Sequence, residues 1–414
     1  MTIVNSSSSS SVSSSARHPE VIVAKFGGSS VRDAAAMQAC GKTIAQYPAI
    51  RLVILSATYN TTNELEQMAA VAAQEKTTIS GRAVTACLPW PSLLKVLEQK
   101  HRLLAQDLAI LAEVEDDLTQ ILEGLRQDLT ITEQALKLDP VLMAKIYAVG
   151  ELLSSKIFTA YLKKAFPQRQ VVWLDSRQYI ITHQAGNGVP IDFLASQRAC
   201  QALATSIAAA PPILYVAQGF IGQTADGRAA TLGREGSDYS ATAYAGLLKA
   251  TTVQIWTDVA GIATSDPHQI KHTKFLQKLS YGQAAALAEQ GAKVLHERTM
   301  EPLIKDQIKL VVAKVGSTAP GTWIGPEDAP AKLLAIHAKI APGPEATPAA
   351  QIFFLGNFSA QEIQQDLQNF FAQNYPAHPP SWQWQEAPKG GCLQILAGPT
   401  LELWQKLHDY FFQG

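Results

Sequence analysis

Cysteine is scarce in this chain, and the few cysteines lie far apart. The 414 residues include only Cys40, Cys87, Cys200 and Cys392, and no two of them form a C-x-x-C pair. Structural zinc sites and disulfide frameworks need cysteines that are closely spaced or paired in small secreted domains. The sequence therefore indicates neither kind of site, and it fits a reducing compartment, for which we expect the cytoplasm.

An excess of one charge and long apolar runs are also missing. The net charge is −1 and charged residues make up 17% of the chain, so we expect no electrostatic preference for nucleic acid or an anionic membrane. No apolar run reaches the roughly 18 residues of a membrane span, and the N-terminus has no basic segment followed by an apolar core. We therefore expect neither nucleic acid nor a membrane as a partner.

The chain does have the length and apolar content of a globular protein with two domains, one of them large. It has 414 residues, of which 47% are hydrophobic. Residues 1–19 contain a serine tract too polar to repay the entropy of ordering, so we expect a disordered tail there. After it, near-continuous apolar strands alternate with helices. This pattern predicts an α/β fold with a mostly parallel central sheet covered by helices on both faces.

Leucines recur at helical spacing among charged residues from about residue 93 to 136. Two stripes illustrate the spacing: Leu103, Leu104, Leu108 and Leu111, then Leu118, Ile121, Leu122 and Leu125. The pattern predicts an antiparallel helix pair, a lid inserted in the sheet domain, whose leucines pack in the core rather than against a cofactor.

The most informative stretch is the turn from Lys25 to Val31, which reads Lys-Phe-Gly-Gly-Ser-Ser-Val. It follows an apolar strand and precedes a helix, so a lysine, bare glycine N–H groups and the positive end of a helix dipole converge there. This combination predicts an anion site, most naturally for a phosphate. The spacing matches neither the Walker A loop nor the dinucleotide fingerprint, and an ordinary Gly-Gly turn capped by serine is the alternative.

Two polar segments follow this turn in the sequence. Residues 58–63 come directly after the apolar strand at 51–57, at the carboxyl end where open α/β sheets place their ligands. Glu151 stands in a second segment, which we place in the first turn of a helix. Both also have plain structural explanations, the loop as a solvated helix cap and Glu151 as a partner of the helix dipole.

A second helix N-terminus suited to bind an anion is predicted at residues 231–240, which read Thr-Leu-Gly-Arg-Glu-Gly-Ser-Asp-Tyr-Ser. A turn containing glycine delivers Ser237 and Asp238 to the N-terminus of an alanine-rich helix, and Arg234 offers a fork suited to a carboxylate. Arg234 and Asp238 are otherwise explained as a surface pair beside a helix cap. We favour a site because the sheet topology can bring the two helix starts face to face.

Together these segments resemble the aspartokinases, the branch of the amino-acid-kinase family that phosphorylates the side-chain carboxylate of L-aspartate. The match includes the turn at 25–31, Ser-Ala-x-x-x-x-Thr-Asn at 56–63, Gly-Glu-x-x-Ser at 150–154 and the segment at 231–240. It continues through Thr-Asp-Val-x-Gly-Ile-x-Thr-x-Asp-Pro at 257–267 and Gly-Ala-Lys-Val-Leu-His at 291–296. The motifs keep the family's order over roughly three-quarters of the chain.

The resemblance implies an amino-acid-kinase domain at residues 20–325 that uses ATP with Mg²⁺ to phosphorylate L-aspartate, the first step of lysine, threonine and methionine biosynthesis. It implies these catalytic residues: Lys25, Asp238 and Lys293. It implies these substrate-binding residues: Ser56, Thr62, Glu151, Arg234 and Ser237. It implies these nucleotide-binding residues: Lys25, Gly27, Gly28, Ser29, Thr257, Asp258, Lys293 and Val294. No side chain is expected to act as a dedicated metal ligand.

Four positions depart from the residues usual in the family. Glu235 stands in place of a glycine, Ala263 of a tyrosine, His268 of an arginine and Glu297 of a proline. A positive φ is costly for glutamate, and its charge would lie beside phosphates, so either its backbone is ordinary or the local geometry differs. Ala263 and His268 stand where the family contacts the nucleotide, which leaves nucleotide affinity and specificity open.

Residues 326–414 resemble one small, degenerate ACT-like regulatory unit. Strands are expected at 333–339, 351–355, 381–385 and 392–396 and helices at 359–373 and 399–412, with a proline-rich linker at 341–348. ACT-like units and amino-acid kinases commonly pair, so we expect a homodimer or a higher homo-oligomer. Lysine and threonine are the candidate effectors, and feedback inhibition stays open because the family usually carries two such units.

Two alternatives also stay open. Another amino-acid kinase, acting on glutamate, acetylglutamate or a nucleoside monophosphate, would share the fold and the phosphate sites. The Gly-Glu-x-x-Ser and Gly-Arg-x-Gly-Ser-Asp segments argue against it. A catalytically weak regulatory paralogue would account for Glu235, Ala263, His268 and the short C-terminal unit.

Overall fold

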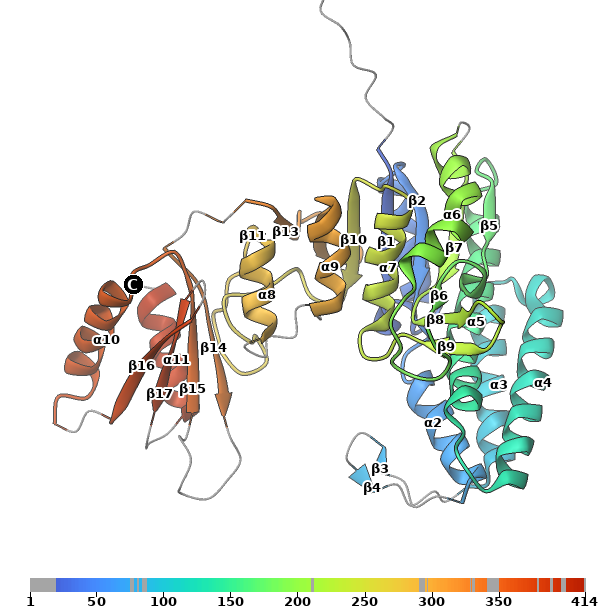
Figure 1. Ribbon diagram of the computed structural model, residues 1–414, viewed down its shortest axis with the longest axis horizontal. Coiled ribbons are helices and arrows are strands. Elements are labelled where there is room, and N and C mark those ends of the chain that lie inside the picture. The colour runs from blue at the N-terminus through green and yellow to red at the C-terminus, as the bar shows by residue number, and fades with distance from the viewer. Residues whose placement is uncertain are drawn as a thin grey trace, which may run out of the picture.

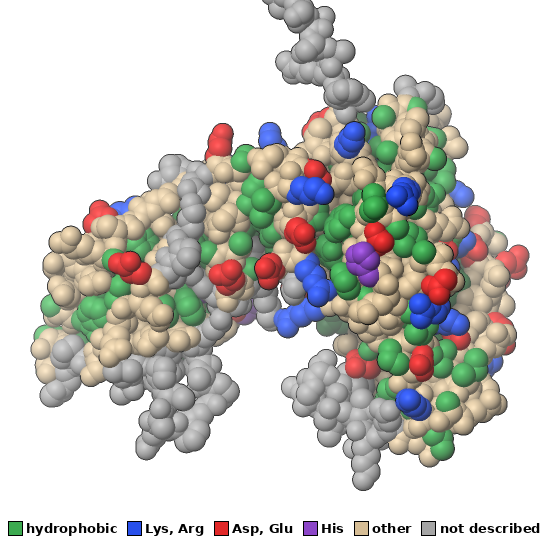
Figure 2. Space-filling view, in the orientation of Figure 1, with side chains coloured by type: hydrophobic (Ala, Val, Ile, Leu, Met, Phe, Trp, Pro, Cys, Tyr) green, Lys and Arg blue, Asp and Glu red, His purple; other side chains and the backbone are tan. Residues whose placement is uncertain are grey.

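The structure is a computed structural model that describes residues 20–74, 78–79, 82–83, 88–209, 212–289, 295, 297–327, 329, 332–340, 350–377, 380–387, 390–395 and 400–412. Figure 1 shows a large α/β unit and a smaller C-terminal unit side by side, with α8 and β11 between them. Figure 2 shows acidic and basic side chains interspersed over the viewed face, in agreement with the net charge of −1.

An eight-stranded sheet forms the centre of the larger unit, in the order β11-β13-β12-β10-β1-β2-β7-β5. Neighbouring strands are parallel except for β12 and β13. The strands are β1 (Ile22–Phe26), β2 (Ile50–Leu55), β5 (Val171–Trp173), β7 (Leu214–Gln218), β10 (Thr252–Thr257), β11 (Lys278–Ser280), β12 (Lys309–Lys314) and β13 (Thr322–Gly325). The predicted mostly parallel sheet is therefore confirmed.

Helices cover both faces of this sheet and divide its core in two. Successive β1 side chains alternate between the two cores, because strand residues point to opposite faces: Ile22 and Ala24 enter one core and Val23 the other. The first face carries α1 (Ala34–Gln46), α2 (Thr61–Ala72) and α5 (Pro140–Ala165). The second carries α6 (Phe193–Ala208), α7 (Gly236–Leu247), α8 (Tyr281–Glu289) and α9 (Glu297–Asp306).

Short elements connect these layers. They are η1 (Gly28–Val31), η2 (Ser176–Gln178), the hairpin β3 (Thr78–Ile79) and β4 (Arg82–Ala83), and a three-stranded sheet of β6 (Ile181–Thr182), β8 (Ile221–Thr224) and β9 (Ala229–Thr231). Within the described residues, no helix combines the length and apolar character needed to cross a bilayer.

The predicted helix pair is present as α3 (Trp90–Asp107) and α4 (Leu111–Ala135), which pack on α2 and α5 (Figure 1). Most of the predicted leucine stripe is buried, including Leu104 and Leu118. Leu103 was wrongly expected in the core, since it is 48% exposed. At about 100° per residue, Leu97 and Leu104 lie on one side of α3 and face the core, while Leu103 falls on the opposite side.

The C-terminal unit is an antiparallel sheet of order β14-β15-β17-β16 with two helices. Its elements are β14 (Leu333–Ile340), β15 (Ala350–Gly356), α10 (Ala360–Asn374), β16 (Trp382–Ala387), β17 (Gly390–Ile395) and α11 (Thr400–Phe412). Phe354, Phe370 and Trp404 are fully buried in its own core. The predicted order of strands and helices is confirmed.

Candidate active site

The glycine turn after β1 and the start of α7 meet at the carboxyl ends of the central strands. The turn continues into the four-residue 3₁₀ helix η1, whereas the predicted α-helix, α1, begins at Ala34 with Asp33 as its N-cap, so the expected helix-dipole end does not lie in the turn itself. Lys25 lies near the end of β1, and Asp238 lies in the first turn of α7, which packs on β1. The Lys25 Nζ is 2.6 Å from Asp238 Oδ1, and Lys25 is 9% exposed. A Cβ added to Gly27 would lie 3.5 Å from the same Nζ, so the ammonium stands directly beside the glycine turn. The predicted convergence of the two anion-ready segments is therefore present.

Gly28 brings the first turn against the loop that follows β2. A Cβ at Gly28 would lie 2.9 Å from the backbone oxygen of Ala57, which leaves no room for a side chain. Ser29 follows in η1 and is half-buried. Glycine is thus needed here for close approach of two backbones rather than for an unusual φ.

The loop after β2 is bound closely to α5. Ser154 Oγ donates to the backbone oxygen of Ser56 at 2.8 Å. A Cβ at Gly150 would lie 2.7 Å from the Cβ of Ala57 and 3.1 Å from Cγ2 of Thr61, so this loop packs directly on the helix turn that carries Glu151. Thr62 follows in the first turn of α2 and is half-buried. The structure therefore brings three predicted substrate-binding residues, Ser56, Thr62 and Glu151, to one region.

Glu151 does not lie in the first turn of a helix, as we predicted, but in the middle of α5. Its side chain is almost completely buried, and its Oε2 has no hydrogen-bond partner. Burial raises the pKa of Glu151 to about 8. A buried carboxyl group with a free oxygen is suited to receive a cation, because a cation would offset the cost of its ionisation.

The turn before α7 has the left-handed backbone conformation that its glycine-containing sequence predicts. Gly233 has φ 82° and Glu235 has φ 54°, so glutamate occupies the left-handed region at the N-cap of the helix. The Oε2 of Glu235 is buried without a hydrogen-bond partner. Of the two possibilities for Glu235, an ordinary backbone is therefore wrong. The residue carries strain of about 1 kcal/mol.

Ser237 and Arg234 differ in their surroundings. A Cβ added to Gly219, at the end of β7, would lie 2.6 Å from Ser237 Oγ, so Ser237 packs on the strand end. Arg234 is exposed. Its guanidinium is therefore accessible to an incoming carboxylate without first being removed from a buried environment.

The predicted nucleotide segment follows β10, the parallel neighbour of β1. Lys25 pairs with Ile255 in this ladder, so Thr257 and Asp258 stand at the same sheet edge as the first turn. Thr257 Oγ1 donates to Asp258 Oδ1 at 3.0 Å, and Asp258 is exposed. Lys293 and Val294 lie outside the described residues. Two residues of this segment differ from those usual in the family: Ala263 is buried and His268 is exposed.

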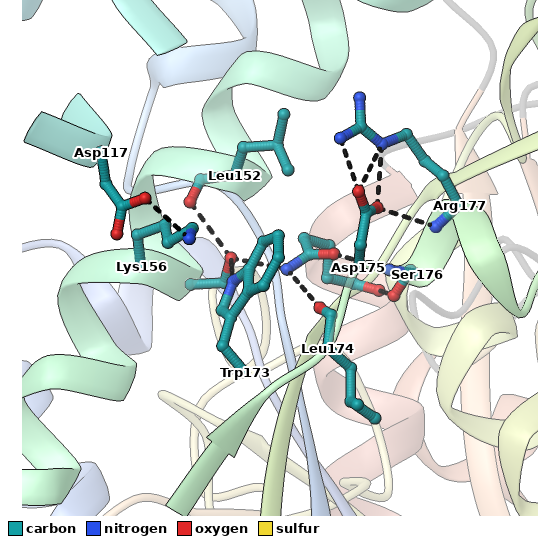
Figure 3. A network of polar contacts seen from close by, with 10 residues as sticks. Asp117, Leu152, Lys156, Trp173, Leu174, Asp175, Ser176 and Arg177 are labelled. Carbon is teal, nitrogen blue, oxygen red and sulfur yellow. Dashed lines mark hydrogen bonds and ion pairs between the residues drawn. The ribbon is translucent and has the colours of Figure 1, made fainter. Parts of the chain in front are cut away.

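A buried polar network, which the sequence analysis missed, supports the end of β7 (Figure 3). Gln218 is fully buried and donates to Ser155 Oγ at 2.7 Å and to the Leu174 oxygen at 3.0 Å, and it accepts from the Ser176 N–H at 2.8 Å. Trp173 Nε1 also donates to Ser155 Oγ. The signal in the sequence was a glutamine directly after an apolar strand and before glycine. Because Gln218 has three partners, it fixes the strand end that carries Gly219.

The edge of the network in Figure 3 consists of ion pairs. Lys156 is 2.8 Å from Asp117 and 4.0 Å from the centre of the Trp173 ring, so it connects α5 with α4 and with β5. The Arg177 guanidinium is 2.6 Å from Asp175 at the start of η2. Asp175 raises the pKa of Arg177 through hydrogen bonding. The Lys156 contacts therefore fix the helical insertion to the sheet, whereas the Asp175–Arg177 pair is local to η2.

The C-terminal unit contacts the segment that follows β10, which the sequence analysis also missed. Ile336 on β14 accepts a hydrogen bond from Ser265 Oγ at 2.7 Å, and its N–H donates to the Thr264 oxygen at 2.8 Å. Thr264 Oγ1 lies 3.0 Å from Nε2 of His408 on α11. The predicted nucleotide segment is thus held by both units.

Comparison with known proteins agrees with this arrangement. Lysine-sensitive aspartokinase 3 of Escherichia coli (strain K12) is 34% identical over 305 residues, which are 71% of this chain and 61% of that protein. The chain matches about three fifths of the length of its first curated relatives. The crystal structure of E. coli aspartokinase III with aspartate and ADP has a TM-score of 0.67 and 25% identity, over 94% of this chain and 83% of that one. Its complex with lysine and aspartate gives the same values.

The resemblance to aspartokinases read from the motifs is confirmed by these similarities. Residues 20–314 match the model of the Amino acid kinase family, and this range includes the whole eight-stranded sheet except β13. Because the match extends over well more than half of the sequence and agrees with the observed fold, the chain belongs to the amino acid kinase family.

Proposed function

We propose that this chain transfers the γ-phosphoryl group of ATP to the side-chain carboxylate of L-aspartate, forming 4-phospho-L-aspartate at the start of lysine, threonine and methionine biosynthesis. The observation that carries the proposal is the meeting of Lys25 with Asp238 at the start of α7, together with the Ala57 loop, which contacts both the Gly28 turn and the α5 segment of the buried Glu151. The similar E. coli aspartokinase III binds aspartate and ADP in its crystal structure.

Phosphoryl transfer requires mainly alignment of two anions and stabilisation of negative charge spread over the transferred group. Lys25 and the N–H groups of Gly27, Gly28 and Ser29 supply positive potential for the phosphates. A lysine 4 Å from a phosphate charge contributes about 4 kcal/mol at an effective dielectric of 20, before desolvation. Asp238 holds the Lys25 ammonium in place. The acceptor is a carboxylate that is already ionised at neutral pH, so no general base is needed.

The remaining nucleotide-binding residues in the proposal are Thr257, Asp258, Lys293 and Val294. Mg²⁺ enters on the nucleotide, since this ion is usually held by substrate phosphates with one or two carboxylates. Within the described residues, no group of three or more His, Cys, Asp or Glu side chains is placed to hold a metal ion. Asp238, in the first turn of α7 beside Lys25, fits the part of a single carboxylate near a phosphate-bound ion.

In this proposal the residues that bind L-aspartate are Ser56, Thr62, Glu151, Arg234 and Ser237. Glu151 receives the α-ammonium group, which offsets the cost of ionising a carboxyl group whose pKa burial raises to about 8. The exposed fork of Arg234 binds a substrate carboxylate in two places. A glutamate substrate is one methylene longer, which places its reacting carboxylate out of line with the phosphates.

Regulation and assembly are part of the same proposal. Residues 326–414 form an ACT-like unit, residues 20–325 the kinase domain with its helical lid at about 93–136, and the protein acts as a homodimer or a higher homo-oligomer. Lysine is the first candidate effector, because the similar E. coli aspartokinase III binds lysine with aspartate in its crystal structure. Threonine is the second.

The test is a hydroxamate assay, in which hydroxylamine traps the acyl phosphate formed by purified protein from ATP, Mg²⁺ and L-aspartate. We expect colour with aspartate and little with glutamate, and a lower rate when lysine or threonine is added to an effector-sensitive enzyme. Colour with glutamate alone would assign another amino-acid kinase. No colour with intact ATP binding by calorimetry would assign a regulatory paralogue.

A further inference from the structure

Two consecutive residues of the helical insertion contact the loop that follows β2. We infer that Lys100 and His101 on α3 are positioning residues, which fix residues 56–63, the loop after β2 and the first turn of α2, and through them the position of Glu151, and thereby set the affinity for the amino-acid substrate. The inference rests on the proposed function, because it assigns that loop and Glu151 to the substrate. It gives the inserted helices a role beyond packing.

The contacts form a chain of hydrogen bonds through two buried threonines. Lys100 Nζ donates to Thr61 Oγ1 at 2.9 Å, to the Tyr59 oxygen at 2.8 Å and to Glu64 at 3.0 Å. Thr61 Oγ1 lies 2.6 Å from Thr58 Oγ1, which lies 3.1 Å from His101 Nε2. Thr58, Thr61 and His101 are at most 2% exposed, so water does not compete for these bonds.

Chemistry fixes the direction of every proton in this chain. The Nδ1 of His101 lies 2.9 Å from the Leu97 oxygen, and since a carbonyl only accepts, Nδ1 carries the hydrogen. Burial lowers the pKa of His101 to about 4, so the ring is neutral at neutral pH and Nε2 accepts.

Thr58 therefore donates to His101, Thr61 donates to Thr58, and Lys100 donates to Thr61. Each hydroxyl donates once and accepts once along this line. The other neutral tautomer would place an unprotonated nitrogen against the Leu97 oxygen, so the observed geometry admits a single arrangement. All three protons of Lys100 also have acceptors.

The threonines in this chain are the immediate neighbours of the residues that form the site. Thr58 follows Ala57, whose Cβ lies against Gly150, the neighbour of Glu151, and whose oxygen lies against Gly28. Thr61 precedes Thr62 in the first turn of α2. Between them Asn60 has φ 66°, so α3 holds both sides of a left-handed turn. Thr61 itself also packs there, since a Cβ at Gly150 would lie 3.1 Å from its Cγ2. A shift of either threonine therefore disturbs the packing of the loop on the α5 turn that carries Glu151.

The experiment measures KM for aspartate and for ATP in the hydroxamate assay with the full chain. Thr58→Val keeps the shape and removes the hydroxyl, while Thr58→Ser keeps the hydroxyl. Lys100→Met removes the three donors, and Lys95→Met, at an exposed position on the same helix, is its matched control. We expect Thr58→Val and Lys100→Met to raise KM for aspartate about tenfold, because each leaves buried polar atoms of the loop or of α3 without a hydrogen-bond partner.

If Thr58 and Lys100 only stabilised the fold, the variants would have a lower melting temperature and a smaller active fraction. KM for aspartate and KM for ATP would then not change by different factors. We expect KM for ATP to change less than about twofold, and Thr58→Ser and Lys95→Met to match the wild type. Thr58→Val or Lys100→Met protein with the wild-type KM for aspartate, or with both KM values raised equally, would overturn the inference alone. If Thr58→Val does not fold, Lys100→Met at its partly exposed position decides. Wild-type protein that makes no hydroxamate would overturn the proposed function as well.

Discussion

The ammonium of Lys25 and the carboxylate of Asp238 lie 2.6 Å apart, although β1 and α7 are far apart in the sequence. α7 packs on β1, and both side chains are at most 16% exposed. Asp238 also lies in the first turn of its helix, where the dipole favours a negative charge. The pair therefore holds a lysine ammonium at the point where the glycine turn after β1 meets the start of α7.

Replacing Lys25 tests this arrangement directly. Lys25→Ala removes the positive charge that offsets phosphate charge in the transition state, and we expect kcat to fall about 10²-fold or more. Lys25→Arg is the matched variant, because it keeps the charge but not the compact ammonium, and it should retain part of the activity. The hydroxamate assay measures kcat, with circular dichroism as the control for folding. Undiminished turnover in Lys25→Ala would remove Lys25 from the catalytic residues.

Glu151 makes stability depend on pH. Its pKa is about 8 in the folded chain against 4.5 for an unperturbed glutamate, so the folded state keeps the proton over a range in which the unfolded state loses it. The free energy of unfolding should therefore fall as pH rises from about 5 to about 8, by at most about 5 kcal/mol at 1.36 kcal/mol per pH unit.

Glu151→Gln should flatten this dependence, because glutamine carries no proton that the two states bind differently. Urea unfolding of both proteins at pH 5 and pH 8 measures the difference. We expect the variant to gain stability relative to the wild type at pH 8. Parallel pH profiles would show that Glu151 ionises normally in the folded chain.

Glu235 stores backbone strain in the turn before α7. With φ 54° and a buried oxygen that has no partner, it is unfavourable in two respects, and glycine relieves both. We expect Glu235→Gly to raise the free energy of unfolding by about 1 kcal/mol, after the extra chain entropy of glycine is subtracted. Glu235→Ala is the control, since it removes the carboxylate but keeps the strained φ. A less stable Glu235→Gly protein would show that the glutamate has a stabilising partner.

Ser265 connects the predicted nucleotide segment to the C-terminal unit. Ser265→Ala removes its bond to the Ile336 oxygen, which still accepts from Trp404 Nε1 at 3.2 Å, so no acceptor is left unsatisfied. We expect the contact between this segment and the C-terminal unit to lose about 1 kcal/mol of stabilising free energy. KM for ATP should therefore rise about fivefold, while KM for aspartate stays unchanged. Initial rates at varied ATP measure it. Equal changes in both KM values would argue for a general loss of structure.

The sequence by itself determined the elements and the chemistry of the turns. Apolar runs predicted the strands, and the residue patterns around Lys25 and Ser237 predicted two turns suited to bind an anion. These properties depend on residues that are close together in the chain. The left-handed turn before α7 also follows local spelling, with Glu235 accepting the strain. The roles of Lys293 and Val294 stay predictions.

Only the tertiary structure decided which of these local features meet and what surrounds them. The middle of α5 and the Ala57 loop bury Glu151 and raise its pKa, and α3 brings Lys100 and His101 to that loop. The C-terminal unit likewise binds the segment after β10 through Ile336 and His408. Burial and hydrogen bonding between distant segments depend on packing of the whole chain, and no local pattern encodes them.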